Sequence, residues 1–348
     1  MKKVVKLLII SLLALATAFS LVACDTANGK TTEKGVSAKK LSGDDFYTVT
    51  GYVAEDGVTS LDIIRAVHEK YGEDIVVGRI RTGSFDGNDT LTEIIVKDET
   101  ENGTLTIDKG AFKNMRALEK ITLPFVGMNA ISDAYYNESE PALGDALKAK
   151  DSERLFGYIF GEEESDYGSE INQAYGDTDS MKATFYIPAT LREVTIDASD
   201  EINIPMYGFY GVSGVTAITL KGSVKAIGVA AFKNTKGLRK LNIPASVTVI
   251  YENAFDGAES LRNFSIDADS ALTAIKASAF KGTNLRSFDI SGTQVEEIGD
   301  YAFFGSLLEE FKFSAAIKTI GVYAFANCKN LTVEAPAGAA VGINAFAK

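Results

Sequence analysis

Phenylalanine recurs at a nearly constant interval along most of this chain, and this periodicity constrains the fold more than any other feature. The residues are Phe85, Phe112, Phe160, Phe209, Phe232, Phe255, Phe280, Phe303, Phe325 and Phe346. The last seven lie 21–25 residues apart, and the intervals of 48 and 49 residues on either side of Phe160 are each about twice that period. A fixed period of this length is typical of solenoids, in which each repeat packs against its neighbours. The sequence therefore predicts one stack of repeats with the phenylalanine rings in its interior.

Every repeat contains the same order of short segments. A first stretch alternates apolar and polar residues, as in residues 238–243, which is typical of a half-buried strand. A second short apolar stretch follows, as in residues 247–250, and the chain then turns at the phenylalanine. Two positions after the phenylalanine stands glycine or asparagine in most repeats: Gly87, Asn114, Gly211, Asn234, Gly257, Gly282, Gly305 and Asn327. Because these residues tolerate a positive φ with least strain, we expect a left-handed turn there; Glu162, after Phe160, departs from the pattern.

Residues 320–331 carry a resemblance to a known repeat family. They read Ile-Gly-Val-Tyr-Ala-Phe-Ala-Asn-Cys-Lys-Asn-Leu, and this resembles the BspA-like leucine-rich repeat, Ile-Gly-x-x-Ala-Phe-x-x-Cys-x-x-Leu. The resemblance extends over residues 84–348 and implies a mainly β solenoid of repeats of about 23 residues, with parallel β-ladders and short helical turns. It also implies a protein on the bacterial cell surface that takes part in adhesion or protein binding. We interpret Cys328 as a small core residue rather than a reactive thiol.

The first residues are typical of an export signal. Lys2, Lys3 and Lys6 precede an apolar run over residues 7–23, and a retained membrane helix is the alternative interpretation. The run ends in Leu-Val-Ala-Cys, which resembles the lipobox of bacterial lipoproteins. This resemblance implies that residues 1–23 are removed and that Cys24 carries the lipid that holds the protein on the outer side of the cell membrane. Cys328 is then the one remaining cysteine, so no internal disulfide can form.

Residues 24–83 are expected to precede the repeats as two parts. Residues 24–44 are rich in threonine, lysine, glycine and serine and predict a flexible tether. Residues 45–83 predict an N-terminal α/β cap, with a helix from Ser60, its N-cap, to Tyr71 and a strand over residues 75–80. His68 lies on the predicted apolar face of this helix, where a structural role is expected. At the other end, the last repeat has no polar cap, which leaves self-association through the C-terminal end as a hypothesis.

Two insertions account for the long intervals. Residues 128–153 and 162–182 together carry −10 of the net charge of −15 that remains when the signal is removed from a chain of −12. They also contain tyrosines, which suit a contact surface. The candidate binding residues are Tyr135, Tyr136, Glu162, Glu163, Glu164, Tyr167 and Tyr175. The alternative interpretation is a pair of solvated, mobile loops.

Several functions are disfavoured by composition. A strongly acidic chain lacks the basic face that nucleic acids require. One histidine and the absence of a nucleophile motif argue against an enzyme, and no cofactor or metal is expected. Asp177, Asp179, Asp267 and Asp269 could supply oxygens to calcium but lack the full binding loop.

The sequence thus predicts a lipid-anchored surface protein that binds another protein or a host extracellular surface. A structural or self-associating envelope component is the alternative. A hydrolase that uses the acidic loop residues is the weakest hypothesis.

Overall fold

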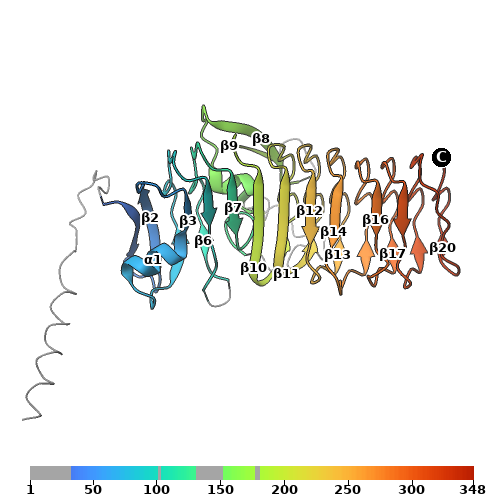
Figure 1. Cartoon of the computed structure of the whole chain (residues 1–348), viewed down its shortest axis with the longest axis horizontal. Helices are drawn as coiled ribbons and strands as arrows, with labels where there is room; N and C mark the ends of the chain where they lie inside the picture. The colour runs from blue at the N-terminus through green and yellow to red at the C-terminus, as the bar shows by residue number, and fades with distance from the viewer. Residues whose placement is uncertain (1–32, 101–102, 131–151, 177–180) are drawn as a thin grey trace, which may run out of the picture. The chain divides into compact units, whose positions relative to one another are not determined.

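Short strands stack coil upon coil and hydrogen-bond in parallel, as the alternating segments predict (Figure 1). The computed structural model describes residues 33–100, 103–130, 152–176 and 181–348. Lys34–Lys348 form one compact unit. This unit is a parallel β-solenoid of about ten turns with little helix, which confirms the predicted fold class.

Two ladders run along the solenoid. The first contains β3 (Ser60–Asp62), β5 (Glu93–Ile95), β7 (Lys120–Leu123), β10 (Glu193–Ile204), β11 (Ala217–Ile227), β12 (Lys240–Ile243) and β14 (Asn263–Ile266). The pair β16 (Ser287–Asp289) and β18 (Glu310–Lys312) occupies the same position in later coils (Figure 1). The second ladder continues from the C-terminal part of β11 through β13 (Val249–Ile250), β15 (Ala274–Ile275), β17 (Glu297–Ile298), β19 (Thr319–Ile320) and β20 (Ala340–Val341). Apart from two register shifts in the β10–β11 pair, the pairing aligns equivalent side chains of successive coils.

The phenylalanines form a continuous buried spine. The nine rings of the series from Phe85 to Phe325 are each at most 2% exposed, and Phe346 is half-buried. From Phe209 onward neighbouring rings stack almost parallel, as between Phe232 and Phe255, whose centroids are 5.0 Å apart at 3°. Phe156 is not part of the predicted phenylalanine series, yet its ring joins the spine. Its centroid lies 5.4 Å from that of Phe160 and 4.9 Å from that of Phe209. The predicted core is confirmed.

The turns contain two left-handed residues rather than one. The eight predicted glycines and asparagines all have φ between 57° and 72°, as expected, and after Phe160 Gly161 takes φ 87°. The residue two positions before the phenylalanine is left-handed as well. This second set comprises Gly83, Gly110, Tyr207, Ala230, Asn253, Ser278, Tyr301, Tyr323 and Asn344. Its residue types vary, so no sequence pattern marked it. The position is held by hydrogen bonds between coils, such as that from the Ala230 N–H to the Glu252 carbonyl at 2.9 Å.

Substitution of Gly282 tests the turn directly. Gly282→Ala is expected to lower the free energy of unfolding by about 1 kcal/mol, because a Cβ at φ 67° is strained. No atom lies within 4 Å of that Cβ, so the loss comes from the backbone alone. Gly282→Asn should cost less, since Asn234 and Asn327 occupy the equivalent position. Urea unfolding measures the effect.

Gly292→Ala is the matched control for Gly282→Ala. Its Cβ also meets nothing within 4 Å, and Gly292 does not have a positive φ. This substitution should leave stability unchanged or raise it slightly. Equal losses at Gly282 and Gly292 would contradict the turn assignment.

The N-terminal cap departs from the prediction in two places. Residues 35–40, expected within the tether, form β1 (Gly35–Lys40), which pairs antiparallel with β2 (Tyr47–Val53). Burial of Val36 and Ala38 against the core stabilises this strand, so the predicted tether is too long. The four-stranded sheet is completed by β4 (Val77–Ile80) and β6 (Thr106–Ile107).

The cap helix begins later than predicted. It is α1 (Ile63–Tyr71), whose N-cap is Asp62 and not Ser60: the Asp62 carboxylate accepts from Arg65 N–H. Ser60 lies in β3, because its neighbour Leu61 pairs with Ile94 in the first ladder. His68 is partly buried, and its Nε2 lies 2.9 Å from the Ile75 carbonyl, which fits the expected structural role.

Both insertions belong to a single enlarged coil. Lys120 of β7 pairs directly with Glu193 of β10, although the chain runs from residue 120 to residue 193 between them. Among the described residues of this interval, the coil turns at η2 (Phe156–Phe160), a short 3-10 helix. The two long phenylalanine intervals therefore reflect one coil with additions before and after its turn.

Ion pairs connect successive coils on the surface. Lys312 Nζ lies 2.8 Å from Asp289 Oδ2 in the β16–β18 pair. Hydrogen bonds from Lys312, and then from Ser291, lower the pKa of Asp289 from 3.8 to about 2. The contribution of Asp289 to stability is therefore complete above about pH 4 and is lost as the pH falls toward 2.

The pH dependence of Asp289→Asn checks this contribution. The substitution should lower stability at pH 6, and the difference from the unsubstituted protein should shrink as the pH falls from 4 to 2. Because both partners are well exposed, the effect is small. Urea unfolding along this pH series measures it, and a difference that stays constant would refute the role of Asp289.

Candidate binding surface on the β8–β9 hairpin

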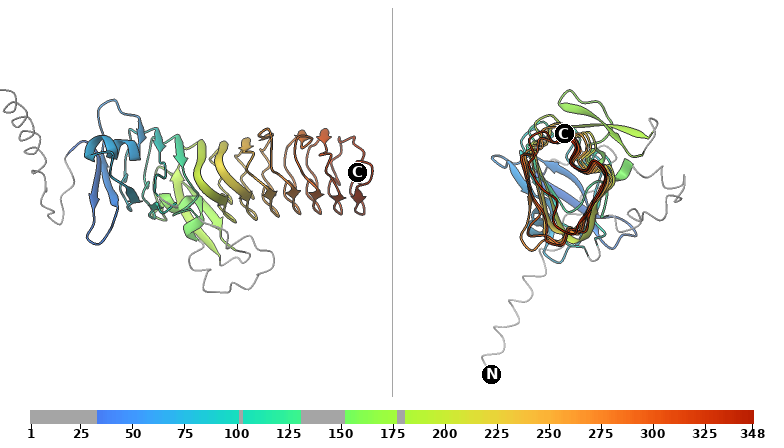
Figure 2. Two further views of the ribbon diagram at one scale, coloured as in Figure 1. Left: turned by 90° about the horizontal axis from the view of Figure 1, so that it is seen from below. Right: turned by 90° about the vertical axis from the view of Figure 1, so that its right-hand side faces the viewer.

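The insertion at residues 162–182 contains the first strand of a β-hairpin, and the second strand begins at its last residue and continues beyond it. Strands β8 (Gly168–Ala174) and β9 (Lys182–Pro188) pair antiparallel from Gly168↔Pro188 to Ala174↔Lys182. The hairpin projects sideways from the stacked coils (Figure 2). The interpretation of this insertion as a solvated, mobile loop is therefore wrong for these residues, because their strands pair and their inner face is buried.

Gln173 fixes the hairpin to the solenoid. Its side chain is fully buried and accepts a hydrogen bond from the Gly157 N–H of η2 at 2.7 Å. Its Nε2 donates to the Gly208 and Tyr210 carbonyls of the next turn, at 3.1 and 3.2 Å. The Gln173 amide thus bonds to three backbone groups from two turns, and these bonds orient the hairpin.

Apolar residues on the same face complete the attachment. Ile171 of β8 and Phe185 and Ile187 of β9 are at most 3% exposed. Phe185 packs so closely over η2 that a Cβ added to Gly157 would lie 2.5 Å from its ring. The inner face of the hairpin is therefore part of the core.

The outer face of the hairpin is polar. Glu170 lies opposite Tyr186, and Asn172 lies opposite Thr184. Thr184 donates to Asn172 at 2.7 Å, and the Asn172 amide donates to Glu170 at 3.1 Å. Beside this row is a hollow of about 640 Å³, here called the hairpin hollow. It is lined by Ser152, Glu162, Glu170, Tyr175, Lys182, Ala183, Thr184 and Tyr186.

Tyr186 is the lining tyrosine whose pKa is shifted from its ordinary value. Loss of hydration, followed by the negative charges of Glu170 and Glu164, raises the pKa of Tyr186. A tyrosine hydroxyl is a hydrogen-bond donor at neutral pH even at its ordinary pKa, and this shift leaves it so. The hollow offers aromatic surface with both donors and acceptors, which suits recognition of a polar ligand.

The predicted candidate residues fall into three groups. Glu162 and Tyr175 line the hairpin hollow, as the binding hypothesis requires. Glu163 instead pairs with Lys113 at 2.7 Å, and this contact raises the pKa of Lys113. The Tyr167 ring lies against the Arg116 guanidinium at 3.9 Å, outside the hollow.

Other predicted residues contribute less. Glu164 is exposed and does not line the hollow. Tyr135, Tyr136, Asp177 and Asp179 lie outside the described residues, as does Cys24. Glu170, Thr184 and Tyr186 were not identified from the sequence, although the alternation of residues 183–187 could have indicated a strand.

Among the described residues, no group of three or more His, Cys, Asp or Glu side chains is placed to hold a metal ion. Asp267, a weak calcium candidate, accepts a hydrogen bond from Asn242. No described helix has the length and apolar character needed to cross a membrane. Cys328 is buried, and burial raises its pKa, which agrees with a core role.

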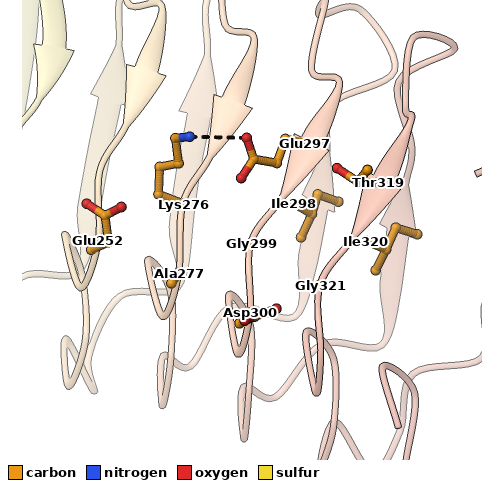
Figure 3. A pocket seen from close by; sticks show the side chains of 10 residues that line it. All are labelled: Glu252, Lys276, Ala277, Glu297, Ile298, Gly299, Asp300, Thr319, Ile320 and Gly321. Carbon is orange, nitrogen blue, oxygen red and sulfur yellow. Dashed lines mark hydrogen bonds and ion pairs between the residues drawn. The ribbon is translucent and has the colours of Figure 1, made fainter. Parts of the chain in front are cut away.

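A second hollow of about 450 Å³ crosses the C-terminal coils (Figure 3). Gly299 and Gly321 form part of its lining, and a Cβ on Gly299 would lie 2.5 Å from the Ala277 nitrogen. Two of its carboxylates are engaged within the solenoid: Lys276 binds Glu297 at 3.1 Å, and Asp300 accepts from the Val322 N–H. We attribute this hollow to the close approach of glycine-containing coils.

Comparison with known proteins agrees with this architecture. Six copies of the family model "BspA type Leucine rich repeat region" match residues 76–142 and 182–335. Comparison with curated protein sequences gives no match. Solved structures with similarity include a leucine-rich repeat protein from T. pallidum, 21% identical, with a TM-score of 0.42 over 53% of this chain and 87% of that one.

Two further solved structures span most of the chain. A leucine-rich repeat protein from Eubacterium ventriosum is 18% identical, with a TM-score of 0.41 over 90% of this chain and 93% of that one. A leucine-rich cell surface protein from Faecalibacterium prausnitzii is 17% identical, with a TM-score of 0.29 over 92% and 86%. The repeats themselves decide the assignment, since the matched segments cover more than half of the sequence. This chain belongs to the BspA-type leucine-rich repeat family.

Proposed function

We propose that this protein is anchored by a lipid on Cys24 to the outer side of a bacterial cell membrane and binds a protein partner. The observation that carries the binding proposal is the hairpin, whose outer face is exposed while Gln173 and Phe185 fix its inner face. The repeat family and the solenoid fold fit a surface interaction module, and they are typical of binding or structural proteins rather than enzymes.

Physical considerations favour the hairpin hollow as the contact surface. A hairpin that is already ordered loses little conformational entropy on binding. Tyr175 and Tyr186 offer contact area and a hydroxyl, while Glu162 and Glu170 offer acceptors. A partner with donor groups and some aromatic or aliphatic surface would complement this set.

Binding can be tested with the full-length chain purified in a mild detergent. Candidate partners are host extracellular matrix proteins, immobilised one at a time and probed by biolayer interferometry. For a partner that binds, the combined change Glu170→Ala and Tyr186→Ala should weaken affinity at least about ten-fold, a typical result for central contact residues. Unchanged affinity would remove the hairpin from the proposal.

The control carries Glu296→Ala and Lys318→Ala. This exposed pair, 2.7 Å apart, lies on coils distant in the chain from the hairpin. Binding should be unaffected, while both doubly substituted proteins should keep the circular dichroism spectrum of the unsubstituted protein. Loss of binding in the control alone would indicate that the contact surface lies on the C-terminal coils and not on the hairpin.

Lipid anchoring has its own test. In a bacterial host that processes lipoproteins, the chain should incorporate labelled palmitate and stay in the membrane fraction, because two or more acyl chains anchor stably. Cys24→Ser should abolish the label. Label retained by this variant would rule out Cys24 as the modified residue.

A second candidate function is self-association through the edge of β20. Val341 and Ile343 of that coil are 47% and 74% exposed, and exposed strand edges favour pairing with another chain. Analytical ultracentrifugation should show concentration-dependent dimers that Ile343→Lys disperses. A monomer at every concentration would exclude this function.

A further inference from the structure

A stretch of fifty residues in this acidic chain contains no acidic residue. Residues 202–251 hold neither aspartate nor glutamate, although the whole chain carries a net charge of −12. The same stretch holds six cations: Lys221, Lys225, Lys233, Lys236, Arg239 and Lys240. It runs from the end of β10 through β11 and β12 to β13 (Figure 1). The net charge of the chain therefore conceals a local basic surface on these coils.

Two lysines of this stretch are paired with acids of the next coil. Lys233 Nζ lies 2.9 Å from Asp256 Oδ2, and Lys236 Nζ lies 3.8 Å from Glu259 Oε1. These two acids are therefore engaged before β14, the strand of that coil, begins.

Three cations further along have no such partner. Arg239, Lys240 and Arg262 are exposed, and within the described part of the chain none of them makes an ion pair or a side-chain hydrogen bond. Arg239 and Arg262 lie side by side in neighbouring coils, because the Arg262 N–H donates to the Arg239 carbonyl at 3.2 Å. In the coil after β14, Arg286 pairs with Glu309. Like charges on neighbouring strands repel each other, so the fold gains no stability from placing these cations together. We call Arg239, Lys240 and Arg262 the basic strip.

Neutral polar side chains lie beside the basic strip. On the next outward-facing row of the ladder, Asn242 lies between Thr219 and Ser265. The Ser265 hydroxyl donates to Asn242 Oδ1 at 2.6 Å, and the Asn242 amide donates to Asp267 at 3.1 Å. The surface thus offers cations next to hydroxyl and amide groups.

We propose that the basic strip binds a sulfated glycosaminoglycan, a linear polysaccharide that carries sulfate groups and hydroxyls along its length. Guanidinium groups form paired hydrogen bonds with oxyanions. Successive coils lie about 4.8 Å apart, so two guanidinium groups can contact one chain together. Thr219, Asn242 and Ser265 would bond to the sugar hydroxyls, which an acidic peptide lacks. None of these residues lines the hairpin hollow, so the proposal does not depend on the proposed function.

Heparin is the probe for this surface. The full-length chain in a mild detergent should bind immobilised heparin saturably in biolayer interferometry at about 0.1 M NaCl, where charges are only partly screened. Affinity should fall as the NaCl concentration rises, because binding releases counterions from the polyanion. Hyaluronan, which lacks sulfate, and poly-glutamate should each bind at least about ten-fold more weakly than heparin. Absence of heparin binding would overturn the proposal.

Removal of the basic strip should weaken this binding. The combined change Arg239→Gln, Lys240→Gln and Arg262→Gln should lower heparin affinity at least about ten-fold and make its salt dependence shallower, because fewer counterions are released. The circular dichroism spectrum should stay that of the unsubstituted protein, since all three side chains are exposed.

The matched control combines Arg65→Gln, Arg81→Gln and Lys318→Gln. It removes the same charge from exposed positions outside the strip, so heparin affinity should equal that of the unsubstituted protein. Equal losses in the two triply substituted proteins would assign heparin binding to overall charge. Hyaluronan or poly-glutamate that binds as tightly as heparin would exclude a sulfated sugar as the ligand. Either result overturns the proposal.

Arg262→Glu keeps the test decisive if the triply substituted strip does not fold. The new carboxylate would lie next to Arg239, so attraction replaces repulsion and the midpoint of urea unfolding should not fall. Heparin affinity should still drop at least about ten-fold, because the new charge repels sulfate. Unchanged heparin affinity in this folded protein would refute the basic strip.

Discussion

Phe255→Ala is expected to lower the free energy of unfolding by about 3–5 kcal/mol. The ring is fully buried and stacks between Phe232 and Phe280 at 5.0 and 4.9 Å, with Phe264 edge-on at 5.5 Å. Removing it leaves a cavity in the middle of the spine, where coils on both sides lose contacts. Because stability in a solenoid depends on interfaces between neighbouring repeats, the loss should affect the whole unfolding transition. Urea unfolding followed by circular dichroism measures it.

Phe346→Ala is the matched control for the spine. This ring occupies the equivalent position in the last coil and stacks on Phe325 alone among the described aromatic rings, at 5.3 Å. It is only half-buried, so its removal should cost clearly less than that of Phe255. Equal losses at the two positions would contradict a core that is continuous along the stack.

Gln173→Leu is expected to destabilise the protein by about 3 kcal/mol. The change keeps the side-chain volume roughly constant but leaves the Gly157 N–H and the Tyr210 carbonyl without the amide that pairs them. An unpaired buried polar group costs about 1–3 kcal/mol. Hydrogen exchange should show the amides of β8 and β9 losing protection, while those of β12–β14 remain protected unless the solenoid as a whole unfolds.

Asn172→Leu provides the comparison on the same strand. Asn172 points to the exposed outer face, where it contacts Thr184 and Glu170. Its replacement should change stability by less than about 0.5 kcal/mol, as is usual for surface positions. A small effect at Gln173, or loss of hairpin protection in both proteins, would show that the hairpin is held by its apolar residues rather than by the amide.

The repeat architecture was predictable because it depends on local patterns that recur. The phenylalanine period located the spine, and glycine or asparagine after each ring located one left-handed turn, since only these residues adopt it without strain. The second left-handed position escaped prediction. It is occupied by residues as different as Ala230 and Tyr301, because hydrogen bonds between coils impose the backbone conformation there whatever the side chain.

The sequence indicated the segment that carries the candidate site, but it did not indicate the hairpin or the hollow beside it. Acidic residues and tyrosines pointed to the insertion at residues 162–182, and two of them, Glu162 and Tyr175, line the hollow. The same composition also fits a mobile loop. The sequence gives the charge of the segment directly, whereas an ordered backbone depends on contacts with segments far away in the chain. Gln173 illustrates this, because its partners Gly157, Gly208 and Tyr210 lie 16 to 37 residues away in the chain.

The sequence by itself determined that this protein is a stack of short parallel coils around an aromatic spine, because each coil repeats a pattern that buries one face against the next. Only the tertiary structure decided that both insertions belong to one enlarged coil and that one of them forms part of a hairpin fixed to the solenoid. It also brought the Ser199 hydroxyl to the Asp98 carbonyl. These features depend on contacts between segments far apart in the chain, where no local pattern records which backbone groups and side chains meet.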